Sequence, residues 1–123
     1  MDHPQDIIAS VRKHPEIHKA GMILCHIGIV RDHARDGRPV KGLRVRVDHE
    51  RLGRVLTEQR RRPGIIDIRA SIAEDRDLAV GEDIMALVVA GDVRENVLAV
   101  LTDTLNLIKT TVTEKTQYFR DES

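Results

Sequence analysis

The stretch Gly91–Lys115 reads GDVRENVLAVLTDTLNLIKTTVTEK and decides the fold of this chain. Its apolar side chains recur every three or four residues, which is the period of a helix with one buried face. They are Val97, Val100, Leu101, the partly apolar Thr104, Leu105 and Ile108. Asp92 and Glu95 have the spacing of a capping box, and the β-branched run at 110–113 favours an end. We therefore predict a long amphipathic helix packed on the rest of the chain.

Cationic side chains stand at both ends of this helix. Arg94 lies at its start, Lys109 at its end and Lys115 just beyond, which suggests an anion nearby. Ordinary solvated helix ends would give the same pattern. Arg94 and Lys109 are fifteen residues apart, roughly 22 Å along a helix, so they cannot grip one small ligand from the same helix. If both serve one site, a second copy of the chain supplies one of them, which predicts a homodimer.

The segments before this helix alternate between strand and helix patterns. Strands are expected at 21–31, 40–47, 65–72 and 84–90, a turn at 78–81, and helices at 6–13 and 50–60. The first of these strands is almost continuously apolar, which indicates burial on both faces, and Gly28 within it marks a bulge or a close approach. Asp48 is a suitable N-cap for the helix at 50–60. This order predicts an α+β or α/β sandwich built on one main sheet.

Length and composition limit the function classes. The 123 residues fit a single domain, 1–123, and twenty basic residues balance twenty acidic ones. One Tyr, one Phe and no Trp leave almost no stacking platform for nucleic acid, so binding through Arg60–Arg62 is the weakest of our hypotheses. These arginines also fit a solvated helix end. The single Cys25, the absence of a membrane-length apolar run and the absence of a signal pattern predict a cytoplasmic protein.

The candidate chemistry is cationic. The six histidines and Cys25 lack the spacing of a metal site, so we predict no metal and no cofactor. Arg31, Asp32 and His33 form a charged cluster directly after the first strand, where functional sites are often built. Arginine suits phosphate because its planar fork donates paired hydrogen bonds. Lysine suits proton transfer or covalent chemistry.

The segments AGMILCHIGIVRDH and AVGEDIMALVVAG are similar to two segments of the MoaE family, the large catalytic subunits of molybdopterin synthase. The first resembles the family pattern Gly-Ala-(apolar)-(apolar)-x-(aromatic)-x-Gly-x-Val-Arg-x-His. The matching residues are Gly21, Gly28, Val30, Arg31 and His33. AVGEDIMALVVAG resembles a Pro-Gly-(acidic)-(acidic)-(apolar) turn and strand, which a His-Arg pair and a long helix ending in Leu-Lys follow. Arg94 and Lys109 match that arginine and lysine, and the resemblance covers about 14–115.

This resemblance implies a fold and a reaction. The fold is an α/β hammerhead type, an α+β single domain with a mainly antiparallel sheet and packed helices, assembled as a dimer. The reaction passes sulfur from the thiocarboxylated Gly-Gly tail of a small ubiquitin-like (MoaD-like) subunit to cyclic pyranopterin monophosphate, in molybdenum cofactor biosynthesis. Carried over by position, Lys109 is the principal catalytic lysine, and Arg31, His33 and Arg94 bind substrate.

Two departures from the family pattern keep an alternative open. Val93 stands where the family has the histidine of its His-Arg pair. The second family lysine would fall on Thr116, whereas Lys115 is one residue early, and a one-residue deletion before it restores the match. Lys115 is therefore our second catalytic candidate. The alternative is a dimeric, non-catalytic paralogue that binds a phosphorylated pterin or a ubiquitin-like tail. Loss of activity on substitution of Lys109 would separate the two.

Overall fold

A computed structural model gives the fold of residues 1–120. The helices are α1 (Pro4–Arg12), α2 (His49–Arg60) and α3 (Arg94–Leu107), with a 3₁₀ turn η1 (Ile17–Lys19) and a π-helical turn η2 (Ile108–Val112). The strands are β1 (Met22–Ile29), β2 (Val40–Val47), β3 (Ile65–Ile72), β4 (Asp77–Ala79), β5 (Asp83–Gly91) and β6 (Thr113–Phe119). Every strand pair is antiparallel among these elements, so the predicted α+β class is confirmed.

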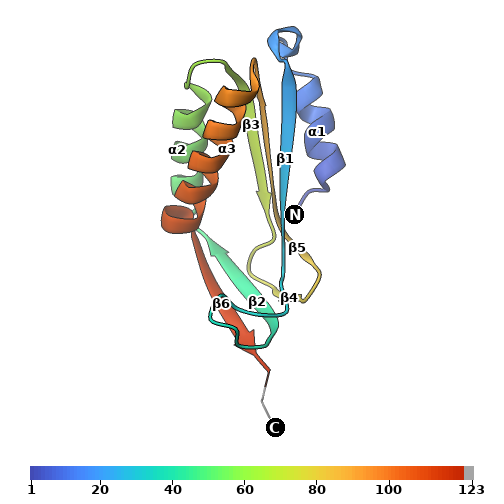
Figure 1. Ribbon diagram of the computed structural model, residues 1–123, viewed down its shortest axis with the longest axis vertical. Helices are drawn as coiled ribbons and strands as arrows, with labels where there is room; N and C mark the ends of the chain where they lie inside the picture. Colours follow the sequence, from blue (N-terminus) through green and yellow to red (C-terminus); the bar gives the residue numbers. More distant parts are fainter. Residues whose placement is uncertain (121–123) are drawn as a thin grey trace.

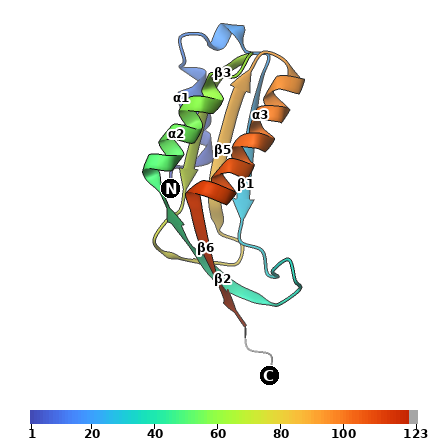
Figure 2. The same ribbon diagram turned by 90° about the vertical axis from the view of Figure 1, so that its left-hand side faces the viewer.

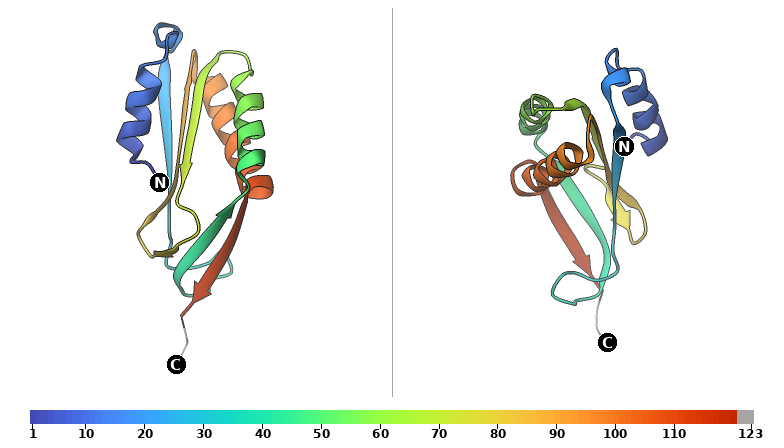
Figure 3. Two further views of the ribbon diagram at one scale, coloured as in Figure 1. Left: turned by 180° about the vertical axis from the view of Figure 1, so that it is seen from behind. Right: turned by 45° about the horizontal axis from the view of Figure 1, so that its top comes forward.

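The strands form two sheets, not the single main sheet that the sequence predicted. One has the order β1-β5-β3, with α1 on one face and α2 and α3 on the other (Figure 1). The second has the order β4-β2-β6 and extends beyond the end of the first, as Figure 3 shows from two sides. The prediction failed because β6 is polar and follows a helix without a turn signal. Its partner β2 was therefore assigned to the wrong sheet, and β4 was expected to be a turn.

The first sheet buries its middle strand, β5. Seven consecutive residues of β5, from Met85 to Gly91, are buried. The strand β1, which was expected to be buried on both faces, is instead an edge strand of intermediate burial, and its Ile27 and Ile29 are 41% and 55% exposed. Its apolar run reflects an edge partly covered by helices. The irregularity predicted at Gly28 is confirmed, since the register with β5 shifts between Gly28 and Ile29.

Helix α3 packs its predicted face on this sheet. Val97, Val100, Thr104 and Ile108 are buried, and Leu101 and Leu105 pack against the same core. The predicted capping box is wrong, because the N-cap is Val93 and no side chain caps it. The backbone N–H of Asp92 donates to the Gly64 carbonyl at 2.8 Å, which keeps Asp92 tied to the end of the sheet. The helix consequently starts one residue later than expected.

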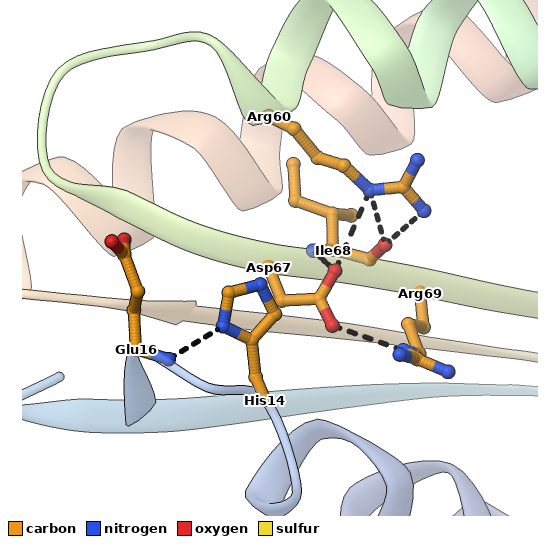
Figure 4. Close-up of polar contacts among 6 residues, drawn as sticks. All are labelled: His14, Glu16, Arg60, Asp67, Ile68 and Arg69. Atoms are coloured by element: carbon orange, nitrogen blue, oxygen red, sulfur yellow. Dashed lines mark hydrogen bonds and ion pairs between the residues drawn. The ribbon is translucent and has the colours of Figure 1, made fainter. Parts of the chain in front are cut away.

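The C-terminal end of α2 is tied to β3 by a buried carboxylate (Figure 4). The Asp67 carboxylate is 7% exposed, accepts from the Arg69 Nε at 2.9 Å and lies 3.5 Å from the Arg60 Nε. Arg60 also donates to the Ile68 carbonyl through Nε and Nη2, at 3.0 and 2.6 Å. Arg62 binds Asp103 on α3. The arginines of 60–62 are thus not simply a solvated helix end, since two of them hold elements together.

One buried group predicts a stability change. The Thr104 hydroxyl is fully buried and has no hydrogen-bond partner among the described residues. Replacing it by a methyl group of the same shape, Thr104→Val, should raise the free energy of unfolding by about 1 kcal/mol, because an unpaired buried hydroxyl is costly. Denaturant unfolding measures this. The control is Thr102→Val on the exposed side of α3, whose hydroxyl is already bonded to the Leu98 carbonyl. Destabilisation by Thr104→Val would contradict the assignment.

Candidate functional site

A pocket of about 380 Å³ lies where the C-terminal end of α3 meets both sheets. Figure 2 shows α3 leading straight into β6, which runs beside β2 below the first sheet. The titratable side chains that line this pocket are His26, Arg35, Lys109 and Lys115. Its apolar lining includes Val45, Ile72, Ile84, Met85 and Ile108. Three cationic side chains above an apolar floor make this a site for an anionic ligand.

The π-helical turn η2 positions Lys109. Ile108 is fully buried and fixes the start of this turn in the core. Three threonine hydroxyls then donate to backbone carbonyls four or five residues earlier in the chain. Thr110 donates to the Asn106 carbonyl at 2.8 Å, Thr111 to that of Leu107 at 2.6 Å and Thr113 to that of Ile108 at 3.3 Å. The β-branched run that predicted the helix end thus builds the turn that carries Lys109.

The pairing register of β6 positions Lys115. Lys115 is opposite Val45 of β2, and Thr116 is opposite Arg44. Because side chains alternate along a strand, Thr113 and Lys115 share one face, and both line the pocket. Thr116 falls on the other face. Lys115, although it comes one residue before the position expected from the family pattern, is therefore the β6 residue that shares the pocket with Lys109.

His26 lies on β1 and lines the same pocket. Its neighbour Cys25 packs on the opposite side of the sheet, with the α1 cluster. Burial and the nearby Lys109 ammonium both lower the pKa of His26 below its ordinary value, with burial the larger cause. The imidazole is consequently neutral at neutral pH. Sequence reasoning left His26 out of the site, although its spacing of two from Gly28 indicated a shared face.

Arg35 is the second pocket residue that sequence reasoning missed. It lies in the loop between β1 and β2, where strand alternation gives no signal. Backbone bonds close this loop, with the N–H of Ala34 donating to the Arg38 carbonyl at 2.9 Å. The Arg38 guanidinium sits 3.8 Å from the centre of the Phe119 ring, which fastens the loop to β6. A cationic loop side chain is thereby held at the pocket rim.

The other three predicted site residues lie outside the pocket of a single chain. Arg31 uses its Nε to bind the His33 carbonyl at 2.9 Å. His33 bonds through Nδ1 to the Asp32 carboxylate at 2.8 Å, and this bond lowers the pKa of Asp32. Arg94 is exposed at the first turn of α3, at the opposite end of the helix from Lys109. One chain therefore brings together Lys109 and Lys115 but not Arg31, His33 and Arg94.

A second hollow, of about 530 Å³, lies between α1 and β3 beside the Asp67 cluster. It is the larger of the two, but both of its arginines, Arg60 and Arg69, are paired with Asp67. Asp2 and Asp6 add further negative charge to its lining. This hollow is therefore less suited to an anionic ligand than the pocket with Lys109 is.

Across residues 1–120, no three metal-binding side chains converge, and no helix combines the length and the apolar character that crossing a bilayer requires.

Solved structures with this architecture define the class of protein. One is described as molybdopterin cofactor biosynthesis protein E from Burkholderia multivorans, with TM-score 0.75 and 23% identity over 98% of this chain and 84% of that one. Another is molybdopterin synthase from Staphylococcus aureus, with TM-score 0.71 and 17% identity over 85% and 78%. A complex of subunits 1 and 2 of the Helicobacter pylori molybdopterin-converting factor gives TM-score 0.68 and 15% identity over 96% and 84%. The fold is thus that of molybdopterin synthase subunits.

The family assignment follows from a sequence profile. The profile described as "MoaE protein" matches residues 2–111, and the chain belongs to the MoaE family. No curated protein matches the chain. The low identities to the solved structures mark a divergent member of the family. Family membership gives the chain a role in molybdenum cofactor biosynthesis.

The environment of His26 predicts a measurable titration. In an NMR titration, the His26 ring should lose its proton at a pH below the ordinary histidine value of about 6.5. Lys109→Met should raise this pKa, because removing a nearby positive charge makes the imidazolium less unfavourable. Lys13→Met, beyond the far face of the sheet at the end of α1, should leave it unchanged. An unaltered His26 titration in Lys109→Met would show that the two side chains are not close.

Proposed function

We propose that this chain is a catalytic large subunit of molybdopterin synthase. It passes sulfur from the thiocarboxylated tail of a small ubiquitin-like subunit to cyclic pyranopterin monophosphate. The observation that carries the proposal is that Lys109 and Lys115 line one pocket, although one comes from a π turn and the other from a strand. That arrangement preserves a two-lysine site despite the shift of the second lysine in the sequence.

The charges of the pocket suit the proposed reactants. A thiocarboxylate and a cyclic phosphate are both anions, and Lys109, Lys115 and Arg35 supply three positive charges around an apolar floor. Fixed cations in a partly dehydrated site stabilise negative charge that develops during transfer. Lys109 is held next to the buried Ile108, so we propose that its side chain contacts the atoms that react. Lys115 lies on the strand at the rim, so we assign it the incoming tail or phosphate.

The partner we propose is a small sulfur-carrier subunit. The similar Helicobacter pylori structure is a complex of two subunits of a molybdopterin-converting factor, which supports a two-subunit enzyme here. A slender Gly-Gly tail fits a pocket of about 380 Å³. The reactants are soluble metabolites and proteins, so we place the reaction in the cytoplasm.

We further propose a homodimer in which each site takes Arg94 from the partner copy. Within one chain, Arg94 and Lys109 stand at opposite ends of one helical segment. Val93 and Leu98 beside Arg94 are 49% and 45% exposed, which gives this end of α3 an apolar surface for a second copy. Arg31 and His33, in the exposed loop after β1, are assigned to substrate binding with Arg94.

The alternative function is a non-catalytic binding module with the same pocket. Val93 favours it, because an exposed valine beside Arg94 cannot move a proton as the family histidine at that position can. The two lysines favour the enzyme, because binding alone does not require both to face one pocket.

A conversion assay tests the enzyme. This protein, a thiocarboxylated small subunit and cyclic pyranopterin monophosphate are mixed, and molybdopterin is detected as its fluorescent oxidised derivative. Lys109→Ala and Lys115→Ala should each lower the rate at least about 100-fold, since each removes a charge that stabilises the transition state. Thr116→Ala is the matched control and should retain the wild-type rate, because its side chain points away from the pocket.

The outcomes separate the two functions. Small-subunit binding without product by the wild-type chain would overturn the enzyme and favour the binding module. Neither binding nor product would overturn both. An intact rate in Lys115→Ala together with a loss in Thr116→Ala would contradict the register of β6 as the basis of the site.

Mixed dimers test the shared site. Lys109→Ala and Arg94→Ala are each expected to be inactive as homodimers. If Arg94 acts across the interface, random exchange of equal amounts yields heterodimers with one intact site, and about a quarter of the wild-type activity should return. Analytical ultracentrifugation of the mixture checks that dimers form. If each chain carried a complete site, the mixture would stay inactive.

A further inference from the structure

One side chain of the pocket is suited to accept a proton during the reaction. The role inferred for it rests on the proposed sulfur transfer. Among the four titratable side chains that line the pocket, Lys109, Lys115 and Arg35 are donors when charged, and arginine stays charged at any physiological pH. His26 alone among these four is an imidazole. A reaction that must remove a proton inside this pocket therefore finds its base on β1.

The chemistry of a thiocarboxylate donor creates such a step. When the sulfur of the tail bonds to an electrophilic carbon of the acceptor, a carbon–oxygen bond of that carbon breaks and its electron pair leaves with the oxygen. The tail carbonyl and the acceptor carbon then share one sulfur, as a thioester. Product leaves only when water attacks the carbonyl carbon. A carbon–oxygen bond then forms, the carbon–sulfur bond breaks, and its electron pair departs with the sulfur as a thiolate. The tail ends as a carboxylate, and two protons are released.

We propose that His26 is the general base for this hydrolysis. Its ring accepts one proton from the attacking water, and the second proton, from the new carboxylic acid, passes to solvent. Lys109 and Lys115 balance the negative charge on the carbonyl oxygen and the departing thiolate. This assigns proton transfer to His26, whereas the lysines act through their positive charge.

The surroundings of His26 fit this role. The ring is half-buried, and no hydrogen bond occupies either of its nitrogens within residues 1–120, so it is open to water. Gly28, two residues along the same strand, keeps the adjacent space clear. A Cβ at position 28 would stand 3.7 Å from the His26 Nε2 and 3.4 Å from the Met85 Cγ. The absent side chain leaves room for a water molecule next to the imidazole.

The charges that face His26 keep it in the basic form. Lys109 from η2, Lys115 from β6 and Arg35 from the loop before β2 are the charged groups of the pocket, and all are cationic. Burial and Lys109 lower the pKa of His26, so the imidazole remains neutral into weakly acidic solution. A neutral imidazole with a pKa near or below neutrality is a competent acceptor of a proton from water.

The test separates sulfur attack from hydrolysis in a single turnover. Wild-type enzyme, thiocarboxylated small subunit and cyclic pyranopterin monophosphate are mixed, quenched over time and analysed by mass spectrometry. In His26→Gln, which keeps a polar side chain but removes the base, the adduct of tail and acceptor should accumulate. Its hydrolysis should slow at least about 100-fold, the typical contribution of a general base. His26→Phe should give the same result with a ring of similar size.

The pH dependence and a control complete the test. Wild-type hydrolysis should fall as the pH drops through the pKa of His26, and both variants should lose this dependence. His18→Phe, on η1 and outside the pocket, should behave as wild type. Hydrolysis at the wild-type rate and with the wild-type pH profile in His26→Gln would overturn this inference while leaving the sulfur transfer intact. Failure of the wild-type chain to form any adduct would overturn the proposed function itself.

Discussion

The way in which α3 ends is the constraint on which the rest of the structure depends. The helix cannot simply stop, because Ile108 and Val112 on either side of Lys109 are both buried in the core. The chain continues instead as one wider, π-helical turn, and threonine hydroxyls donate to carbonyls of the last turn of α3. An exposed lysine is thereby fixed between two buried anchors. Because of this wider turn, the chain continues directly into β6 without a loop. The strand β6 thereby connects the helical layer to the second sheet.

The register of β6 against β2 then sets which side chains meet. Val47 pairs with Thr113 and Val45 with Lys115, so the buried face of β2 fixes the face of β6 that looks into the pocket. A shift of one residue in β6 would place Thr116 opposite Val45 and turn Lys115 to the other face. The packing of Val45 and Leu43 in the core therefore holds the lysine in place. The same packing therefore both stabilises the core and sets the geometry of the site.

Sequence reasoning predicted the elements that bury an apolar face and missed those that do not. The period of α3, the alternation of β2 and the Asp48 cap all matched the structure, because each follows from burial or capping within a short stretch. Strand β6 has no such local signal, since five of its seven residues are charged or hydroxyl-bearing. The pocket formed by His26, Arg35, Lys109 and Lys115 depends on that strand, so only its two lysines were found in advance, through the family resemblance.

The pocket combines three cationic side chains with one imidazole that can accept a proton. Three cations attract and hold anions. Burial, with the nearby Lys109 charge as a second cause, lowers the pKa of the one imidazole and favours its neutral form. Lys109 thus adds to the effect of burial in keeping the histidine basic, while both lysines neutralise the groups that it acts on. Because β1 is an edge strand and Gly28 carries no side chain, water can reach that imidazole. A site that binds an anionic tail and then hydrolyses it needs both properties, and the fold supplies them from opposite walls, with the lysines on η2 and β6 and the base on β1.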